Sequence, residues 1–330
     1  MRIRSAVLAA VVGVLALAGV LHGAAGPPSI RPLEPRPAGV RAEAEVRKDV
    51  PYASASPVQT LHLSLPHRYG VAVPLVVVVH GGGWFEGDKG DVLGIVQSLN
   101  AAGYATAAVG YRLSGEAPFP AAVVDVATAV RWVRAHASTY GVDASRIALM
   151  GLSAGGHLAS MVAVTGGETD VLGDDAAPFA SGVADDVARR SAAVQAVVSW
   201  YGPSDFAAMD AQAAVSACRG EPDVHGGADS PESRWLGVPV ATHPERAAAA
   251  APATYLDGAG DLPPFHLAHG DRDCTVPRAQ SDGLAAALRD AGASVSLTVL
   301  PDGEHATDAF TEEQIGPSID FLDGVLGAAP

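Results

Sequence analysis

The sequence has few cysteines, few aromatic residues and few basic residues. Two of its 330 residues are cysteines, aromatic residues make up 5%, and 21 Lys and Arg stand against 36 Asp and Glu. The net charge of −15 argues against nucleic acid or an anionic membrane surface as a partner. The eleven histidines form no HExxH motif and no closely spaced His/Asp/Cys set, so we expect no catalytic metal.

Apolar residues nevertheless make up 48% of the chain, enough for one large domain with a substantial core. Because aromatic residues are few, Ala, Val and Leu must fill most of that core. Apolar runs predict strands at 58–65, 74–79, 104–111, 146–150, 194–200, 264–268 and 295–300. Helices are predicted at 90–102, 120–139, 154–164, 277–291 and 312–326. This alternation predicts an α/β fold with a mostly parallel sheet, antiparallel strands at its start and helices on both faces.

Two segments interrupt the alternation of strands and helices. Residues 166–190 are rich in Gly, Ala and Asp, which favours a surface excursion. In residues 207–252, Pro222, Pro231, Pro239 and Pro244 divide any helix into short pieces. Inserted segments at such positions often overhang an active site, so we expect a small lid or wall there.

The N-terminus has the pattern of a secretory signal peptide. Arg2 and Arg4 precede the uncharged apolar stretch 5–21, and small residues follow with a cleavage site expected near Ala25. We therefore expect residues 1–25 to direct export, which places the protein in a secreted or extracytoplasmic location. The stretch is long for a signal peptide and short for a membrane span, so an uncleaved membrane anchor is the alternative.

The remainder of the chain is expected to contain a spacer and one domain. Residues 26–50 begin proline-rich and show no periodicity, as in a semi-extended spacer. Residues 51–330 hold the alternating strands and helices and form the domain.

The two cysteines are Cys218 and Cys274. In an exported protein an even number is compatible with one disulfide, and two separate buried thiols are the alternative. If paired, they tie the inserted segment to the loop at residues 271–277.

Ser153 has the surroundings of a nucleophile. The predicted strand 146–150 runs directly into Gly-Leu-Ser-Ala-Gly at 151–155, and a helix is predicted to follow. A G-x-S-x-G motif between a strand and a helix raises the serine out of the sheet on a tight turn, and glycines are needed because larger residues would clash. The alternative is that these small residues stand at the start of a helix by coincidence. The glycine-rich loop that lies upstream, at 80–84, disfavours this alternative.

A glycine-rich loop follows the buried-strand pattern Leu-Val-Val-Val-Val at 75–79. The loop reads His-Gly-Gly-Gly-Trp at 80–84, and glycines let backbone N–H groups approach a developing oxyanion closely. The expected oxyanion hole consists of the backbone N–H groups of Gly82, Gly83 and Ala154, the last being the residue after the nucleophile.

The acid and the base of a triad follow Ser153 in the chain order Ser, Asp, His. Asp273 lies in a loop between a predicted strand and Pro277, a residue favoured in the first turn of a helix. Asp271 is the competing acid and more typical of a turn-capping carboxylate. His305 lies just past the strand predicted at 295–300, where an imidazole can reach the serine; a surface loop histidine is the alternative.

Together these stretches resemble α/β-hydrolase esterases of the group that carries HGGGW and GxSxG motifs. The group includes hormone-sensitive-lipase-like carboxylesterases and bifunctional feruloyl and acetyl-xylan esterases. The resemblance covers 80–90, 111–137, 143–160, 200–206, 269–277 and the loop to His305. It is closer to the feruloyl and acetyl esterase branch, because the acid lies in HGDRDCTVP and no DPLRDEG-like segment occurs.

This resemblance implies the α/β-hydrolase fold for 51–330 and a serine esterase acting through an acyl-enzyme without metal or cofactor. We expect short-acyl esters, small or attached to a polymer, as substrates, and neither nucleic acid nor a stable membrane partner unless the N-terminal segment is uncleaved. The alternatives are a feruloyl or acetyl-xylan esterase, or a lipase. An arylformamidase, a peptidase or an inactive hydrolase-fold binding protein is disfavoured.

Four further side chains lie near these motifs. Trp84 is expected either to line the substrate pocket or to plug the glycine loop, and Tyr201 to contact substrate because it follows a predicted strand. His80 is interpreted as a brace for the loop. His157, four residues beyond Ser153, is expected to pack beneath the turn.

Overall fold

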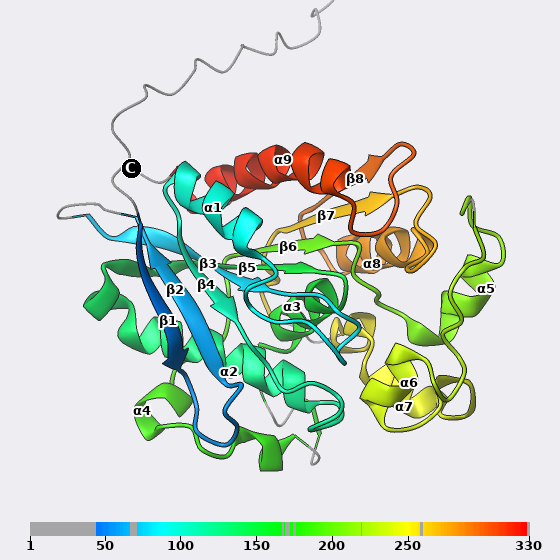
Figure 1. The fold of residues 1–330 in the computed structure, drawn as a ribbon, viewed down its shortest axis with the longest axis horizontal. Helices are drawn as coiled ribbons and strands as arrows, with labels where there is room; N and C mark the ends of the chain where they lie inside the picture. Colours follow the sequence, from blue (N-terminus) through cyan, green and yellow to red (C-terminus); the bar gives the residue numbers. More distant parts are fainter. Residues whose placement is uncertain are drawn as a thin grey trace, which may run out of the picture. The chain divides into compact units, whose positions relative to one another are not determined.

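The centre of the fold is a sheet of eight strands (Figure 1). The computed structural model describes residues 44–66, 71–166, 168, 172–173, 176–218, 220–257 and 260–328. The expected signal peptide and most of the expected spacer lie outside these residues. Among the helices that the described residues form, none combines the length and apolarity needed to cross a membrane.

The mostly parallel sheet predicted from the sequence is confirmed. Its strands are β1 (Glu45–Pro51), β2 (Thr60–Leu65), β3 (Val73–Val79), β4 (Ala105–Val109), β5 (Val142–Leu152), β6 (Ala196–Trp200), β7 (Phe265–Gly270) and β8 (Val295–Leu300). They lie in the order β1-β2-β4-β3-β5-β6-β7-β8. β2 is antiparallel to both β1 and β4, and the other neighbours are parallel. The carboxyl ends of the parallel strands therefore meet at one edge of the sheet.

Helices cover both faces of the sheet. The long helices are α1 (Leu93–Ala102), α2 (Ala121–His136), α3 (Ala154–Thr165), α8 (Ala279–Asp290) and α9 (Asp308–Leu326). The short α-helices are α4 (Asp185–Ala188), α5 (Met209–Ala213), α6 (Pro231–Leu236) and α7 (Pro244–Ala249). Single 3₁₀ turns occur at η1 (Ala137–Tyr140), η2 (Ala177–Ala180), η3 (Phe206–Ala208), η4 (Val240–Thr242) and η5 (Pro252–Tyr255).

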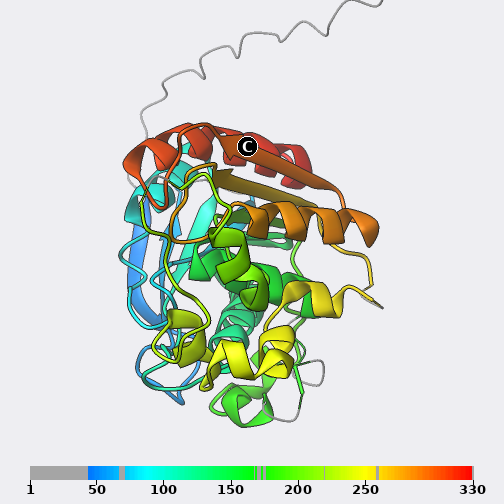
Figure 2. The ribbon, with the colours of Figure 1, turned by 90° about the vertical axis from the view of Figure 1, so that its right-hand side faces the viewer.

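The side chains of β3 explain why helices cover both faces of the sheet. All seven residues of this central strand are buried. Leu75, Val77 and Val79 pack in the core cluster that includes α2, α3 and α8. Val76 and Val78 point to the opposite face and pack in the cluster that includes α1 and α9. A strand buried on both faces must be apolar at every position, which is the continuous run seen in the sequence. Figures 1 and 2 show α1 and α9 together on one face.

The sheet begins inside the segment expected to be a spacer. β1 spans residues 45–51 and pairs with β2, so the domain starts before residue 51. Its side chains are almost all exposed, because an edge strand is held by backbone pairing on one side. The polar sequence EVRKDVP therefore carries no apolar signal of a strand.

Prolines shape the inserted segment 207–252 as expected. α6 begins at Pro231 and α7 at Pro244, both at the first helical position, where the missing N–H costs no hydrogen bond. Ser230 caps α6 by accepting a hydrogen bond from the N–H of Ser233. In Figure 1 the short helices α5, α6 and α7 lie beyond the carboxyl ends of the strands.

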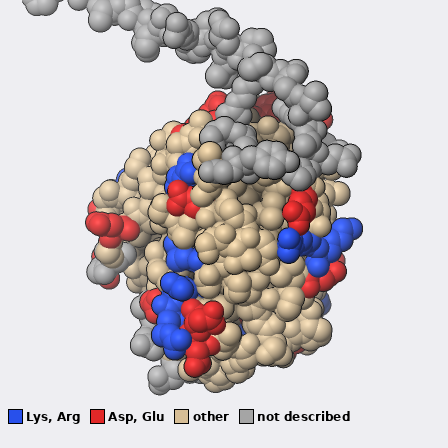
Figure 3. Space-filling model, turned by 90° about the vertical axis from the view of Figure 1, so that its left-hand side faces the viewer, with Lys and Arg blue, Asp and Glu red and all other residues tan. Residues whose placement is uncertain are grey.

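Charged side chains on the face shown in Figure 3 form small mixed groups. Basic and acidic residues lie next to one another there, around a largely uncharged area. Two ion pairs of this mixed kind are Arg47 with Glu45 in β1 and Arg146 with Asp143 in β5, each with 2.8 Å between nitrogen and oxygen. The exposed pair of Arg47 with Glu45 contributes little to stability, about 0–1 kcal/mol.

A disulfide joins Cys218 to Cys274, which confirms the pairing considered from the sequence. The bridge closes a loop of 56 residues and connects the inserted segment to the loop that follows β7. The N–H of Asp223 donates to the carbonyl oxygen of Cys274 at 3.0 Å, so the same two segments are also joined by a backbone hydrogen bond.

Reduction of this disulfide is expected to lower the melting temperature by several degrees. Opening a loop of this length releases chain entropy in the unfolded state worth about 4 kcal/mol. The measurement is a thermal melt with and without dithiothreitol. The matched control is the double variant Cys218→Ser/Cys274→Ser, whose melting temperature should be low and insensitive to the reductant. Equal melting temperatures for oxidised and reduced wild type would contradict the prediction.

Candidate active site

Ser153 stands on a strained turn between β5 and α3. Its φ is 52° and its ψ −122°, a conformation that residues other than glycine rarely adopt. A Cβ on Gly155 would lie 2.2 Å from the carbonyl oxygen of Val79, and one on Gly151 would lie 2.1 Å from the carbonyl oxygen of Gly155. Only glycines fit at these two positions, so the motif is a packing requirement of the turn.

The structure brings Ser153, His305 and Asp273 together. Nε2 of His305 lies 3.0 Å from Oγ of Ser153, and Nδ1 lies 2.7 Å from Oδ2 of Asp273. The three residues follow β5, β8 and β7 respectively, so they meet at the carboxyl edge of the parallel strands. This arrangement can transfer the serine proton to the imidazole while the carboxylate holds the opposite ring nitrogen.

Asp273 is held by more partners than the sequence indicated. Its Oδ1 accepts hydrogen bonds from the N–H groups of Thr275 (2.9 Å) and Val276 (2.8 Å). Its Oδ2 also lies 3.2 Å from Nε2 of the buried His269. Burial alone raises the pKa of the carboxyl, but the hydrogen bonds from His269 and His305 outweigh it and hold the pKa of Asp273 well below its usual range. Asp273 is therefore ionised at neutral pH.

His269 is a residue of this site that the sequence interpretation missed. Its Nδ1 accepts from the hydroxyl of Ser281 at 2.7 Å, which leaves Nε2–H to donate toward Val276 and Asp273. In the sequence it ends an apolar strand, and only its position four residues before Asp273 distinguishes it. Asp271, the competing acid, makes none of these contacts.

The residues expected to form an oxyanion hole lie beside Ser153. Gly82 and Gly83 line the same cavity as Ser153, with φ of 102° and 55°. A Cβ on Gly82 would lie 2.2 Å from the carbonyl oxygen of Glu86, so this position requires glycine. Ala154 is the first residue of α3, and its N–H has no acceptor within the helix. Backbone N–H groups in this position are suited to bind an anion.

Trp84 and Tyr201 both line the cavity at Ser153. The rings of Tyr201 and His305 are 4.6 Å apart, so Tyr201 contacts the base directly. Burial, together with the charge of Asp273, raises the pKa of Tyr201, which stays neutral. Trp84 is 1% exposed and stacks on Trp235 at 4.8 Å, so it also plugs the loop, as the second interpretation expected.

His80 and His157 take the supporting positions expected of them. His80 stacks on Tyr111 at 4.3 Å, and the hydroxyl of Tyr111 donates to the carbonyl oxygen of His80. His157 lies beneath the turn in α3, within 5.3 Å of the ring centroid of Trp84. Its Nε2–H donates to the carbonyl oxygen of Ala250 at 2.7 Å, while Nδ1 has no partner among the described residues.

Stability is expected to fall as the pH decreases from about 6.5 to about 4 because of His157. Complete burial among aromatic rings lowers the pKa of this histidine to about 4. Between these pH values the unfolded chain binds the proton and the folded chain does not, so the free energy of unfolding decreases with pH, by roughly 3 kcal/mol in all for this group.

Urea unfolding at pH 7.5, 6 and 5 measures the effect. The control is His157→Gln, which can still donate to Ala250 but does not titrate. Its unfolding free energy should depend less on pH than that of the wild type, although other buried histidines contribute to both proteins. Parallel pH dependence in the two proteins would refute the assignment to His157.

A cavity of about 1030 Å³ opens at Ser153. One side is formed by the glycine loop with residues 81–87, and another by residues 223–232 of the inserted segment, which confirms the expected wall. Within the described ranges, no group of three or more His, Cys, Asp or Glu side chains could hold a metal ion.

The fold and this site define a protein of the α/β-hydrolase class. Residues 61–288 match the model of the BD-FAE family, and the chain belongs to that family. The resemblance drawn from the HGGGW and GxSxG motifs is confirmed.

Two similar proteins carry the names of ester hydrolases. The esterase LipQ of Mycobacterium tuberculosis is 30% identical over 265 residues, which cover 78% of this chain and 57% of that protein. The carboxylic ester hydrolase LipM of the same organism, named as probable, is 32% identical over 238 residues, 71% of this chain and 49% of that one. The chain thus spans about half the length of these relatives.

Solved structures give the same class. A truncated carbohydrate esterase from gut microbiota has a TM-score of 0.74 and 28% identity, and the match covers 87% of this chain and 98% of that one. A bifunctional GH43-CE protein of Bacteroides eggerthii has a TM-score of 0.73 and 30% identity, over 86% of this chain and 35% of that one.

Proposed function

We propose that the protein is a serine esterase with Ser153 as nucleophile, His305 as general base and Asp273 as the group that orients the imidazole. The observation that carries the proposal is the pair of hydrogen bonds, 3.0 and 2.7 Å long, that link the three side chains. The strained turn under Ser153 and membership of the BD-FAE family add support. An inactive binding protein would have no need of all these parts.

The chemistry follows from the positions of the groups. Oγ of Ser153 attacks the ester carbonyl carbon while Nε2 of His305 takes its proton, and the N–H groups of Gly82, Gly83 and Ala154 bind the oxyanion. The protonated imidazole then gives its proton to the leaving alcohol, and an acyl-enzyme remains. Water, deprotonated by His305, attacks the acyl group, and the imidazolium then returns the proton to Oγ of Ser153 as the carboxylic acid leaves.

The substrates are proposed to be carboxylic esters with a short acyl group. The chain is rich in small residues and has only 5% aromatic residues, and this favours a short acyl group over a long lipid chain. The second candidate is an acetyl or feruloyl esterase acting on carbohydrate. One structural relative is named a carbohydrate esterase, and the cavity is larger than a short acyl group alone needs.

Export is part of the proposal. Disulfides persist in oxidising compartments, and the bridge between Cys218 and Cys274 suits such a location. Expression of the full chain followed by fractionation tests this. A soluble product that begins near residue 26 supports a cleaved signal peptide, whereas a full-length product in the membrane fraction supports the anchor.

Hydrolysis of p-nitrophenyl acetate, butyrate and octanoate, methyl ferulate and acetylated xylan tests the activity and orders the acyl groups. A p-nitrophenyl phosphonate provides the test of mechanism, because it should inactivate the enzyme and add its mass to the peptide that contains Ser153. Hydrolysis without modification of that peptide would reject the proposed nucleophile. If the protein hydrolysed none of these esters, the proposed esterase function would be wrong.

A further inference from the structure

The glycine loop contains a tryptophan with a strained backbone. Trp84 follows the two glycines of the expected oxyanion hole, and its φ is 61°. Gly82 and Gly83 also have positive φ, which glycine adopts at little cost. A bulky residue rarely adopts this conformation and keeps it only where its surroundings hold it there. The contacts of Trp84 must therefore offset the strain.

The indole ring of Trp84 is held in an aromatic cluster. It stacks on Trp235, with 4.8 Å between the ring centroids and 15° between the ring planes. Phe206 and His157 contact it edge-on, each with 5.3 Å between centroids. Of these three partners Trp235 lies parallel to the indole and covers a face of it, so it makes the broadest contact.

Trp235 belongs to α6 of the inserted segment, and this helix packs directly on the glycine loop. A Cβ on Gly83 would lie 3.1 Å from Cβ of Pro231, the first residue of α6. The helix thus touches two successive residues of the loop, Gly83 and Trp84. Trp235 is fully buried, and it is not among the described residues that line the active-site cavity. Its side chain therefore acts on the loop and not on the substrate.

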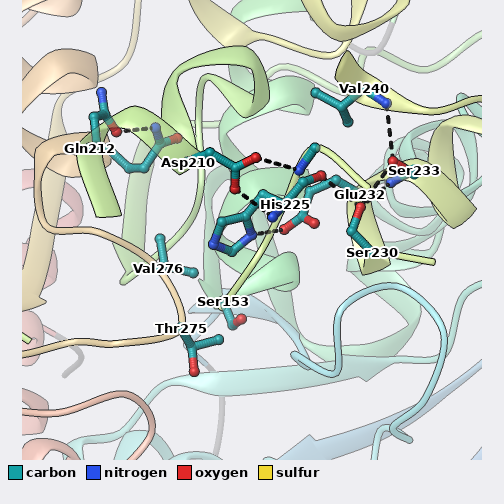
Figure 4. Close-up of polar contacts among 12 residues, drawn as sticks. Ser153, Asp210, Gln212, His225, Ser230, Glu232, Ser233, Val240, Thr275 and Val276 are labelled. Atoms are coloured by element: carbon teal, nitrogen blue, oxygen red, sulfur yellow. Dashed lines mark hydrogen bonds and ion pairs between the residues drawn. The ribbon is translucent and has the colours of Figure 1, made fainter. Parts of the chain in front are cut away.

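Polar contacts fix α6 within the inserted segment (Figure 4). Oγ of Ser230 accepts from the N–H of Ser233 at 3.1 Å, and Oγ of Ser233 accepts from the N–H of Val240 at 3.0 Å. Nδ1–H of His225 donates to Oε1 of Glu232 at 3.0 Å, and both of these residues are buried. The helix is therefore a firm support for the ring of Trp84.

The backbone around Trp84 determines what moves if this support is lost. The carbonyl oxygen of Trp84 accepts from the N–H of Ser114 at 2.8 Å, which fixes the chain on the far side of the strained bond. A change of φ at Trp84 therefore displaces the chain before it, which carries the N–H groups of Gly82 and Gly83. An oxyanion is stabilised only by donors that already point at it, so this displacement would weaken the oxyanion hole.

We propose that Trp235 is a positioning residue for the oxyanion hole, which it keeps in shape by holding Trp84 in its strained conformation. This inference rests on the proposed esterase function, and it gives the inserted segment a part in catalysis besides that of a cavity wall. Donors to an oxyanion bind the transition state more strongly than the substrate, so the contribution of Trp235 falls on kcat and not on KM.

The test compares wild type with Trp235→Leu, Trp235→Phe and the control Trp132→Leu. Trp132 is a buried residue of α2 whose ring contacts His136 and Tyr140. The control therefore makes the same substitution in the core but away from the glycine loop. All assays are made below the melting temperature of each variant.

In Trp235→Leu we expect kcat on p-nitrophenyl acetate to fall about tenfold to a hundredfold, up to the effect of losing one oxyanion donor, with KM within about threefold. The Ki of a trifluoromethyl ketone should rise by a similar factor, because Oγ of Ser153 adds to its carbonyl carbon and places an oxyanion in the hole. Trp235→Phe keeps a smaller ring on Trp84, so it should change kcat and Ki only about threefold. Trp132→Leu should change neither by more than about twofold.

Three outcomes would overturn the inference. Equal losses in Trp235→Leu and Trp132→Leu would show a general effect of core stability. A change in KM alone would assign Trp235 to the shape of the cavity. An unchanged Ki of the ketone would separate Trp235 from the oxyanion hole, since a partly unfolded preparation lowers the rate but not the affinity of its folded fraction. If Trp235→Leu failed to fold, Trp235→Phe would decide, because its changes in kcat and Ki must appear together.

If wild type hydrolysed no ester, the proposed function would fail separately, and hydrogen exchange would then decide the inference. The N–H groups of Phe85 and Glu86 both donate to the carbonyl oxygen of Gly82, so their exchange reports the shape of the loop. Both should exchange about tenfold faster or more in Trp235→Leu than in wild type, and at the wild-type rate in Trp132→Leu. Trp235→Phe would replace a Trp235→Leu protein that did not fold, with a smaller increase expected. Unchanged exchange would overturn the inference.

Discussion

Ester hydrolysis is expected to fall by at least about ten-thousandfold when Ser153 is replaced by alanine. The attacking oxygen is lost, and no other hydroxyl is hydrogen-bonded to Nε2 of His305 in the described structure. What remains is the contribution of the oxyanion hole to attack by water. The measurement is kcat/KM on p-nitrophenyl acetate.

The matched control for this variant is Ser160→Ala. Ser160 is in the same helix, and its hydroxyl only bonds back to the carbonyl oxygen of Gly156, so activity should stay within a few-fold of wild type. Thermal melts of both variants show whether they fold. A folded Ser153→Ala protein with substantial activity would exclude Ser153 as the nucleophile.

The residues of the expected site could be named from the sequence because each of them follows from a local constraint. The turn at Ser153 accepts only glycine at 151 and 155, so the constraint is visible as a motif. The central strands are buried on both faces, so they appear as continuous apolar runs. Chain order then restricts where the acid and the base can lie, since both must follow strand ends at the same edge of the sheet.

The features that the sequence did not predict depend on contacts between distant segments. His269 reaches Asp273 across a loop. The position of His157 was expected, but its aromatic partners Trp84 and Trp235 come from parts of the chain far from it. The pairing of His225 with Glu232 requires the exact path of an irregular segment. No periodicity records such contacts, because periodicity reports only which face of an element is buried.

Replacing Asp273 by asparagine is expected to lower kcat by about a thousandfold to ten-thousandfold, with a smaller change in KM. Oδ2 of Asp273 accepts from Nδ1–H of His305, and it faces Nε2–H of His269 as well. An amide NH₂ in that place would face two donors, and the only relief is for His305 to carry its proton on Nε2. That tautomer cannot accept the proton of Ser153. If the amide were flipped, so that its oxygen accepted from Nδ1–H of His305, the side chain would still lack the negative charge that stabilises the imidazolium.

Asp271→Asn is the control that separates the two acids of this loop. It removes a carboxylate two residues away, and Asp271 makes no hydrogen bond to His305 in the described structure, so kcat should change by no more than a few-fold. The pair of variants therefore tests the identity of the acid and not only the sensitivity of the loop. If Asp271→Asn were the more damaging of the two, the acid would be misassigned. If both variants lost little kcat, the imidazole would need no carboxylate partner. The ionised carboxylate of Asp273 would then have a structural role alone.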